Sequence, residues 1–301
     1  MPVAAVLGWP LAHTLSPRLH QAAYRAAGLR GWRYIARPTP PEELAAALHE
    51  VRAGALVGVN LTTPHKEAAV PLLDALEPPA DALGAVNTVW RAEGPTGLTV
   101  LTGGNTDVAG ALWALERQLG LAGGGWDGGG PAVLLGTGGV AVAVALAWAR
   151  LAEARRRLGL ETCPITVAGR NAQRAARVAA HAGAGATTIG WAEAPQAVAA
   201  AAVLVQATTL TASGEPVPGQ DTLRPGARVL DLNYGPSSQC LVDAARVAGA
   251  SAAADGLGML CAQAAAAVTR IAGIRPDFAA MAVAVGLEVP DQDERERSGA
   301  R

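Results

Sequence analysis

The sequence predicts an α/β fold in two domains, and three of its features support this. Short apolar runs rich in Val, Leu and Ile alternate with Ala-, Leu- and Arg-rich stretches of helical periodicity. Strands that alternate with helices of about 10 to 15 residues indicate parallel sheets covered on both faces. The chain has 301 residues, half of them apolar, which suits two domains better than one. A glycine-rich stretch at 120–131 precedes the most apolar strand, so we place a domain junction near it.

The first part of the chain contains apolar runs that we predict as strands because they are rich in β-branched residues. These runs are at 3–7, 33–36, 55–61, 86–90 and 97–101. The stretches between and after them have the periodicity of amphipathic helices. These helices are predicted at 16–27, 41–51 and 106–119.

The second part of the chain continues this alternation. Further strands are predicted at 132–136, 164–169, 203–208 and 227–234, and further helices at 171–181 and 241–249. The segment 131–149 has no charge and is long enough to span a membrane. Glycines interrupt it near its start, so we interpret it as a buried strand, a turn and a helix. The last residues, 290–301, are highly charged without an apolar period, and we predict that they are disordered.

Charge and cysteine content exclude several classes of partner. The net charge is −1 and the isoelectric point is near 6.5, which argues against a nucleic-acid or anionic-membrane partner. The N-terminus lacks the basic region of a signal peptide. The three cysteines are far apart in the sequence and show no metal-binding spacing, so we expect no metal site and a reduced, cytoplasmic compartment. The basic run at 155–157 is interpreted as a solvated helix end.

A glycine-rich turn predicts dinucleotide binding. The segment GTGGVA follows a predicted strand, begins a predicted helix and matches the pattern G-x-G-x-x-A. In this pattern the first glycine permits a tight turn and the second lets the backbone approach a pyrophosphate. The small third residue lets the helix pack on the sheet. The predicted cofactor-binding residues here are Gly136, Thr137, Gly138, Gly139, Val140 and Ala141.

The residues after the next strand indicate which dinucleotide is bound. An NAD site would favour Asp or Glu at the end of this strand, where the ribose 2′-hydroxyl lies. This chain has Arg170 and Asn171 there, with Arg174 one helical turn later. Guanidinium groups bind a 2′-phosphate through charge-assisted hydrogen bonds, so the predicted cofactor is NADP. Arg177, further along the helix, is interpreted as a surface residue.

The segment NLTTPHKEAAV contains Lys66, the only lysine among the 24 basic residues of the chain. Arginine is permanently charged, whereas lysine can release its proton when its surroundings change. A single lysine in an arginine-rich chain suggests proton-transfer chemistry, although an ordinary surface cation next to Glu67 would also explain it.

Eight segments, in order along the chain, together resemble the shikimate dehydrogenase family. They are AHTLSPRLHQAAY, VNLTTPHKEA, LGAVNTV, GGNTDVAGA, GTGGVA, AGRNAQRA, LNYGP and GLGMLCAQA. The resemblance implies an N-terminal α/β substrate domain formed by 1–106 and 256–289, with the C-terminal helices returning to the first domain. It implies a Rossmann-type NADP domain at 107–255 and a substrate cleft between the two domains.

The family's activity implies a reversible, NADPH-dependent reduction of 3-dehydroshikimate to shikimate, a step of the shikimate pathway of aromatic amino acid biosynthesis. The expected partners are these small molecules, and we expect a monomer or a homodimer. Hydride addition to a ketone builds charge on the oxygen, so a general acid is needed within hydrogen-bond reach. By resemblance this is Lys66, with Asp107 as its partner.

The resemblance also assigns the contacts with the substrate and the cofactor. Two hydroxyls, of Thr14 and Ser16, are expected to bind the substrate carboxylate, and Asn60, Asn87, Gln263 and Asp107 to offer donors and acceptors to the ring hydroxyls. The full set of expected substrate contacts is Thr14, Ser16, Asn60, Thr62, Asn87, Tyr234 and Gln263. Thr208 and Gly256 are expected beside the cofactor.

Some residues depart from the family pattern and leave other functions open. Thr14 replaces the more usual serine, and Gln206 stands where asparagine is usual in the loop that contacts the nicotinamide end of the cofactor. A paralogue that acts on quinate or aminoshikimate is therefore an alternative, as is a catalytically silent NADP-binding regulator. A folate dehydrogenase of two-domain type is a further alternative, against which the segments AHTLSP and NTD argue.

Overall fold

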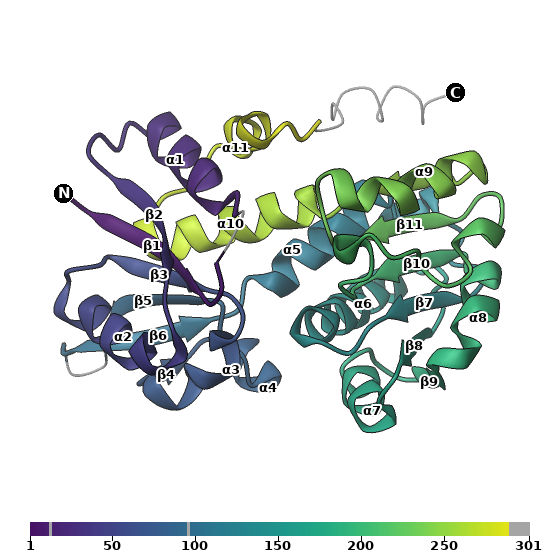
Figure 1. Ribbon diagram of the computed structural model, residues 1–301, viewed down its shortest axis with the longest axis horizontal. Helices are drawn as coiled ribbons and strands as arrows, with labels where there is room; N and C mark the ends of the chain where they lie inside the picture. Colours follow the sequence, from purple (N-terminus) through teal and green to yellow (C-terminus); the bar gives the residue numbers. More distant parts are fainter. Residues whose placement is uncertain (12–13, 95–96, 289–301) are drawn as a thin grey trace.

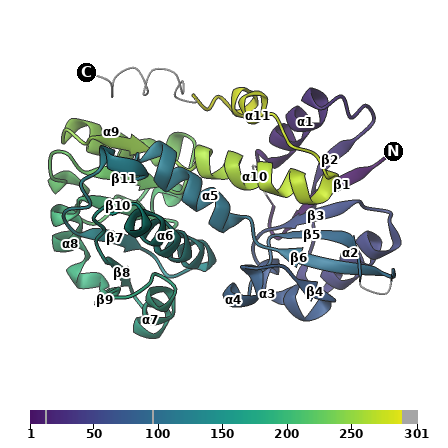
Figure 2. The same ribbon diagram turned by 180° about the vertical axis from the view of Figure 1, so that it is seen from behind.

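The computed structural model describes residues 1–11, 14–94 and 97–288, so the predicted tail at 290–301 lies outside the described residues. The chain forms two lobes, each built on a six-stranded sheet, and two helices cross between them (Figures 1 and 2). The predicted α/β class is thus confirmed.

The first sheet has the order β2-β1-β3-β5-β6-β4 and is mixed. Its strands are β1 Val3–Gly8, β2 Arg33–Pro38, β3 Gly58–Leu61, β4 Ala75–Leu76, β5 Thr88–Glu93 and β6 Thr99–Gly104. The expectation of a purely parallel sheet is wrong here, because β5 runs antiparallel to both β3 and β6. A short loop joins β5 to β6, and a short loop can close only an antiparallel pair, since a parallel pair needs a longer crossover.

Helices cover both faces of the first sheet. One face packs against α1 Ser16–Ala26, α10 Leu257–Ala272 and α11 Phe278–Val285, and the other against α2 Leu44–Ala53. Two single-turn helices, α3 His65–Ala68 and α4 Ala80–Leu83, follow β3 and β4. The last two helices of the described chain therefore return to the first lobe, as Figure 1 shows.

The second sheet is parallel throughout and has the order β12-β11-β10-β7-β8-β9. Its strands are β7 Ala132–Leu135, β8 Ile165–Gly169, β9 Thr187–Gly190, β10 Val203–Gln206, β11 Arg228–Asp231 and β12 Ala252–Ala254. Its helices are α6 Gly139–Arg157, α7 Ala172–Ala180, α8 Ala194–Ala200 and α9 Gln239–Val247. The strand order reverses between β7 and β10, and ligands of open α/β sheets bind at such a switch point.

The lobes are connected by α5 Asp107–Trp113 and α10, which pack against each other. A π-helical turn, Ala114–Gln118, extends α5 into the second lobe. Gly110 lets the two helices approach closely, because a Cβ atom at this position would lie 2.7 Å from the backbone oxygen of Met259.

The glycine-rich stretch lies on the second lobe and not at the junction where we expected it. Arg155 is 2% exposed and donates hydrogen bonds to the backbone oxygens of Leu121, Gly123 and Trp126 at 2.6–2.7 Å. The interpretation of 155–157 as solvated is therefore wrong for Arg155. The glycines allow several carbonyl groups to converge on one buried guanidinium, which satisfies its donors without a carboxylate.

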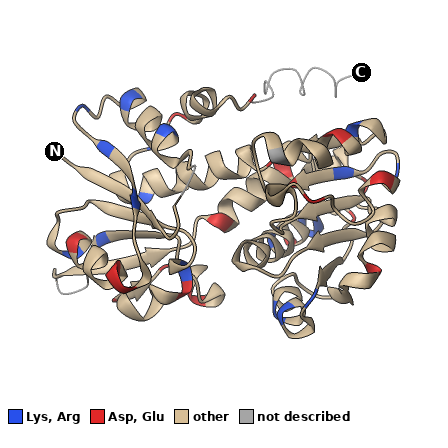
Figure 3. Ribbon diagram, viewed as in Figure 1, with Lys and Arg blue, Asp and Glu red and all other residues tan. Residues whose placement is uncertain are grey.

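Charged residues lie on both lobes, with basic and acidic positions interspersed (Figure 3). Within the described part of the chain, no helix combines the length and the apolar composition needed to cross a membrane.

Candidate active site

A pocket of about 330 Å³ opens between the lobes, and every predicted catalytic and substrate-contacting residue lines it. The first lobe contributes Thr14, Ser16, Asn60, Thr62, Lys66 and Asn87, the crossing helices Asp107 and Gln263, and the second lobe Tyr234. These residues come from segments as far apart as α1 and α10, so the fold brings them together.

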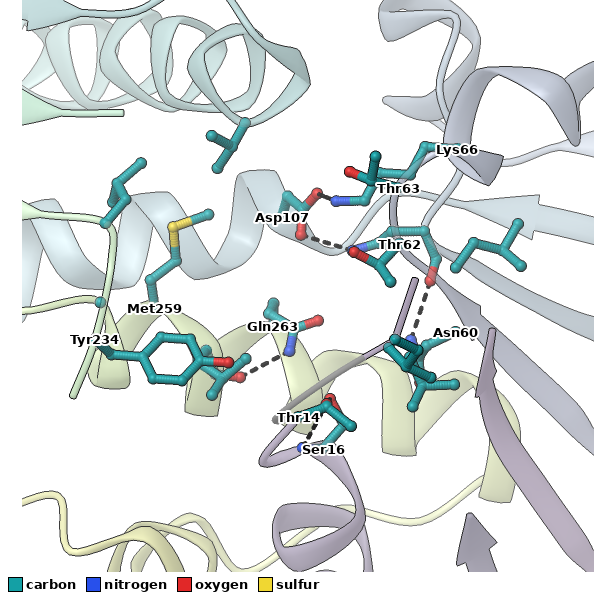
Figure 4. A pocket seen from close by; sticks show the side chains of 18 of the residues that line it. Thr14, Ser16, Asn60, Thr62, Thr63, Lys66, Asp107, Tyr234, Met259 and Gln263 are labelled. Carbon is teal, nitrogen blue, oxygen red and sulfur yellow. Dashed lines mark hydrogen bonds and ion pairs between the residues drawn. The ribbon is translucent and has the colours of Figure 1, made fainter. Parts of the chain in front are cut away.

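Lys66 and Asp107 form an ion pair in this pocket, with 2.6 Å between Lys66 Nζ and Asp107 Oδ2 (Figure 4). Lys66 lies on α3, and its backbone oxygen accepts a hydrogen bond from the backbone N–H of Val86. Asp107 is the first residue of α5, where the positive end of the helix dipole stabilises a carboxylate. The side chains are 27% and 10% exposed, so the pair is screened less than a surface ion pair.

Asn87 holds the other oxygen of Asp107. Its Nδ2 donates to Asp107 Oδ1 at 2.8 Å and to Thr106 Oγ1 at 3.0 Å. Its Oδ1 accepts from the backbone N–H of Thr106 at 2.8 Å and from Thr88 Oγ1 at 3.0 Å. Both amide hydrogens of Asn87 are therefore used within the protein, and its expected contact with a ring hydroxyl stays a prediction.

The side-chain amide of Asn60 is likewise used in hydrogen bonds within the protein. Its Nδ2 donates to the backbone oxygen of Asn87 at 3.1 Å and to Thr88 Oγ1 at 3.0 Å, while its Oδ1 accepts from the hydroxyl of Tyr34 at 2.7 Å. Asn60 therefore faces the pocket with acceptor capacity alone, and its expected contact with a ring hydroxyl stays a prediction. The two asparagines organise the wall of the pocket through bonds to their neighbours.

Thr14 and Ser16 lie on the side of the pocket away from the ion pair, with Gln263 between (Figure 4). Thr14 Oγ1 is 3.2 Å from both the hydroxyl and the backbone nitrogen of Ser16, at the N-terminus of α1. Two hydroxyls beside a helix N-terminus suit an anionic group. One side of the pocket thus has hydroxyls that suit an anion, and the other has the Lys66–Asp107 ion pair.

Gln263 and Tyr234 offer neutral polar groups. Gln263 donates one Nε2 hydrogen to the backbone oxygen of Leu260 at 2.8 Å and keeps a second donor. Burial raises the pKa of the Tyr234 hydroxyl above its ordinary value, so this hydroxyl stays protonated near neutral pH. Met259, which the sequence analysis missed, lies beside Tyr234 on the second-lobe side of the pocket (Figure 4).

The predicted dinucleotide turn connects β7 to α6 next to the pocket, which Val140 also lines. Gly136 has φ +115°, and a Cβ there would lie 2.8 Å from the backbone oxygen of Ala207, so only glycine fits. In the part of the chain that the structure describes, a Cβ at Gly138 or Gly139 would meet no atom within 4 Å, and no side chain caps α6. The first N–H groups of α6 are therefore open to an anion, as a pyrophosphate site requires.

Arg170 and Arg174 lie beyond β8, at the edge of this turn. Both are exposed, and among the described residues neither guanidinium has a hydrogen bond or an ion pair. Asn171 Oδ1 accepts from the backbone N–H of Arg174 at 2.9 Å, so it caps α7. The open glycine turn and these two guanidinium groups fit a phosphorylated dinucleotide. The capping of α7 by Asn171 was not predicted from the sequence.

Thr208 lies next to the glycine turn, in a loop that the side-chain amides of Gln206 and Asn233 hold. Its backbone N–H donates to Gln206 Oε1 at 2.8 Å, and its backbone oxygen accepts from Asn233 Nδ2 at 2.8 Å. Gln206 is fully buried, so the longer side chain at this position is used to fasten the loop. Gly256 is the N-cap of α10, directly before Leu257, and also lines the pocket.

Three further residues of the site, Tyr34, Thr88 and Thr106, were not predicted from the sequence. Thr88 and Thr106 lie inside segments quoted for the family resemblance, VNTV and NTD, which was an available signal. Tyr34 had no such signal, because its contact with Asn60 depends on the packing of β2, β1 and β3.

Comparisons with known proteins agree with this geometry. The sequence model of the shikimate dehydrogenase substrate binding domain matches residues 6–89. The chain is 38% identical to the shikimate dehydrogenase (NADP(+)) of Citrifermentans bemidjiense over 96% of each chain.

Solved structures give the same result over both lobes. The shikimate dehydrogenase of Mycobacterium tuberculosis is 32% identical, with a TM-score of 0.77 over 95% of this chain and 99% of that one. The shikimate 5-dehydrogenase of Thermus thermophilus, solved in complex with NADP(H) and shikimate, is 37% identical, with a TM-score of 0.74 over 95% and 99% of the two chains. The chain therefore belongs to the shikimate dehydrogenase family.

Proposed function

We propose that this protein catalyses the reversible, NADPH-dependent reduction of 3-dehydroshikimate to shikimate. The observation that carries the proposal is the Lys66–Asp107 pair, 2.6 Å apart in a pocket that the glycine turn also borders. The activity by which its relatives are named, shikimate dehydrogenase (NADP(+)), supports the same reaction.

Substrate orientation follows from the two sides of the pocket. The hydroxyls of Thr14 and Ser16 bind the ring carboxylate, and Gln263 and Tyr234 bind ring hydroxyls. The ring ketone then points toward Lys66, on the opposite side of the pocket. A site that hydrogen-bonds substrate hydroxyls rejects analogues that lack them by large factors.

Proton transfer is the task of Lys66. When NADPH is bound it supplies the hydride that adds to the carbonyl carbon. The ammonium group of Lys66 donates a proton to the carbonyl oxygen, so that the ketone becomes an alcohol and the lysine becomes neutral. Its side chain is 27% exposed, which allows the amine to regain a proton from water. In the oxidation direction the neutral amine accepts the alcohol proton.

The cofactor would be held by the glycine turn and by Arg170 and Arg174. The open N-terminus of α6 would bind the pyrophosphate, and the two guanidinium groups the 2′-phosphate of NADP. The open Cβ space at Gly138 and Gly139 supports this assignment, as does the lack of any partner for the two guanidinium groups among the residues that the structure describes. Thr208 and Gly256 would face the nicotinamide end.

The experiment that tests the proposal is steady-state oxidation of shikimate and of quinate by the purified chain, each with NADP and with NAD. We expect shikimate with NADP to have the highest kcat/KM. A higher value with quinate would assign the alternative substrate, and cofactor binding without turnover of either acid would indicate a regulator.

Further assignments stay proposals or predictions. We propose that 1–106 and 256–289 form the substrate domain and 107–255 the NADP domain. A cytoplasmic location, a monomeric or homodimeric state and the absence of nucleic-acid partners are predictions from the sequence.

A further inference from the structure

A continuous chain of hydrogen bonds runs beneath the pocket wall and ends at the Lys66–Asp107 pair. It begins at the hydroxyl of Tyr34, which donates to Asn60 Oδ1 at 2.7 Å. Asn60 Nδ2 donates to Thr88 Oγ1 at 3.0 Å, and Thr88 Oγ1 donates to Asn87 Oδ1 at 3.0 Å. Asn87 Nδ2 then donates to Asp107 Oδ1 at 2.8 Å, and Asp107 Oδ2 binds Lys66.

Two backbone groups fix the direction of every bond in this chain. The backbone N–H of Thr106 can only donate, so the oxygen of the Asn87 amide must face it. The backbone oxygen of Asn87 can only accept, so the nitrogen of the Asn60 amide must face it. The Thr88 hydroxyl accepts from Asn60 and therefore has its single hydrogen available for Asn87. The Tyr34 hydroxyl must then donate to Asn60.

Most of this chain is buried, and two of its members, Tyr34 and Thr88, lie outside the pocket. Thr88 is fully buried, Tyr34 is 5% exposed, and neither lines the pocket. Asn60 and Thr88 are directly opposite each other on β3 and β5, which brings their side chains into contact. The ring of Tyr34 reaches across β1 and stacks on the buried ring of His20, with 3.8 Å between the centroids.

The Tyr34 hydroxyl is a reliable donor. Burial, together with the nearby Tyr24, raises the pKa of Tyr34 well above its ordinary value, so the hydroxyl keeps its proton. Buried polar chains of this kind polarise and rigidify one another when every member is satisfied.

We propose that Thr88, with Tyr34 at the distal end, is a positioning residue that holds Asp107 through Asn87 and so aligns Lys66 for proton transfer. The inference rests on the proposed function for its catalytic consequence. Its structural content, the coupling of Thr88 to Lys66, does not depend on which substrate is bound.

Two substitutions separate the effect of the Thr88 hydroxyl from that of the side chain's shape. Thr88→Val keeps the shape of the side chain and removes both hydrogen bonds, whereas Thr88→Ser keeps the hydroxyl. Loss of a buried hydrogen bond predicts a fall in kcat of about tenfold in Thr88→Val, with a smaller change in KM because Thr88 does not touch the pocket. Thr88→Ser should retain most of the wild-type kcat, and Tyr34→Phe should lower kcat by a smaller factor than Thr88→Val.

Thr102→Val is the matched control. Thr102 is a buried threonine on β6 of the same sheet, 8% exposed, and its hydroxyl has no hydrogen bond within the described residues. The Thr102→Val variant should keep the wild-type kcat. An equal loss of kcat in Thr88→Ser or in Thr102→Val would overturn the proposal, because packing of the sheet would then explain the effect.

A second readout needs no substrate. Lys66 is the only lysine of the chain, so protein labelled with [¹³Cε]lysine gives one lysine resonance, which reports the surroundings of the amine directly. We expect this resonance to move in Thr88→Val and in Tyr34→Phe, and to stay in place in Thr88→Ser and in Thr102→Val. Should Thr88→Val not fold, Tyr34→Phe carries the same test.

The two readouts separate the two proposals. An unmoved resonance in folded Thr88→Val and Tyr34→Phe would overturn the coupling even if the wild type oxidises shikimate. A resonance that moves as expected in a protein that does not oxidise shikimate would support the coupling and refute the proposed function.

Discussion

The two sides of the pocket are built in opposite ways. On the first-lobe side, Asn60, Asn87 and Asp107 satisfy one another through hydrogen bonds of 2.8–3.1 Å that start from buried residues. On the second-lobe side, within the described residues, Gly138 and Gly139 leave open space, α6 has no side-chain cap, and the guanidinium groups of Arg170 and Arg174 have no partner. On the first-lobe side, which we call the closed side, the polar groups already form hydrogen bonds with one another. The second-lobe side has hydrogen-bond donors and positive charges that an anionic ligand would satisfy.

This difference matches what each side has to do in the proposed reaction. A proton donor must hold its geometry before the substrate arrives, because a preorganised site needs no rearrangement during the reaction. A cofactor that binds and leaves at each turnover requires donors that are accessible in its absence. Substitutions on the first side should therefore change kcat most, and those on the second side should change the KM for the cofactor.

The largest effect is expected at Lys66. Lys66→Met removes the proton donor and leaves Asp107 without its cation. Loss of general acid–base catalysis predicts a fall in kcat of about 10²- to 10⁴-fold, measured as 3-dehydroshikimate reduction at saturating substrate. Thr102→Val serves as the control for a folded protein with an intact site. A fall of less than about tenfold would remove Lys66 from the chemistry.

A smaller and more selective effect is expected at Arg174. Loss of hydrogen bonds to a charged group predicts that Arg174→Ala raises the KM for NADP by about 10- to 100-fold, with little change in the KM for shikimate or for NAD. Arg177 lies on the same helix and is also exposed, so Arg177→Ala is the matched control. Equal losses in both variants would mean that the helix attracts NADP only through its overall charge.

A single methyl group, added by Gly138→Ala, should weaken cofactor binding at the glycine turn. Gly138 has φ −82° and ψ 178°, which alanine adopts without strain, and its Cβ would lie in open space. The methyl group would occupy the space proposed for the pyrophosphate, so the KM for NADP should rise about tenfold, the cost of about one weakened hydrogen bond. The melting temperature should stay at its wild-type value. Gly124 has the same open Cβ space, and Gly124→Ala should change neither quantity.

The closed side should be sensitive to acid through His20. Burial lowers the pKa of His20 from 6.5 to about 3, so the folded protein holds it neutral. The unfolded chain takes up a proton below pH 6.5 and the folded chain does not until about pH 3. The free energy of unfolding should therefore fall as the pH drops through this window, by at most about 1.4 kcal/mol per pH unit from this group.

Chemical denaturation between pH 7 and pH 4 measures this dependence. His20→Gln should flatten it, whereas His49→Gln, a change at an exposed histidine, should not. An unchanged slope in His20→Gln would show that other groups cause the loss of stability.

The contrast between the sides also separates what the sequence could predict from what it could not. The turn at 136–141 is local, so its glycine spacing and the strand before it were enough to predict its form. The predicted strands of both sheets were largely right because each is a continuous apolar run. The short strands β4, β9 and β12 were missed, since two to four residues give no period to detect.

The closed side depends on contacts between distant segments. Nothing in the spacing of Lys66 and Asp107 indicates that they meet, and their pairing came from the family resemblance alone. The register of Asn60 against Thr88 exists only because β5 runs antiparallel to β3, which the alternation of strands and helices did not predict. Arg155 was taken as solvated for the same reason, because the carbonyl groups that bind it come from a loop about 30 residues earlier.

The most direct test of the central claim is Lys66→Arg. Arginine keeps the positive charge and can pair with Asp107, but it does not release a proton at working pH. We expect equilibrium binding of shikimate to stay near its wild-type value, while kcat for shikimate oxidation falls by at least about 100-fold. Near-normal turnover by Lys66→Arg would contradict the assignment of Lys66 as the group that transfers the proton.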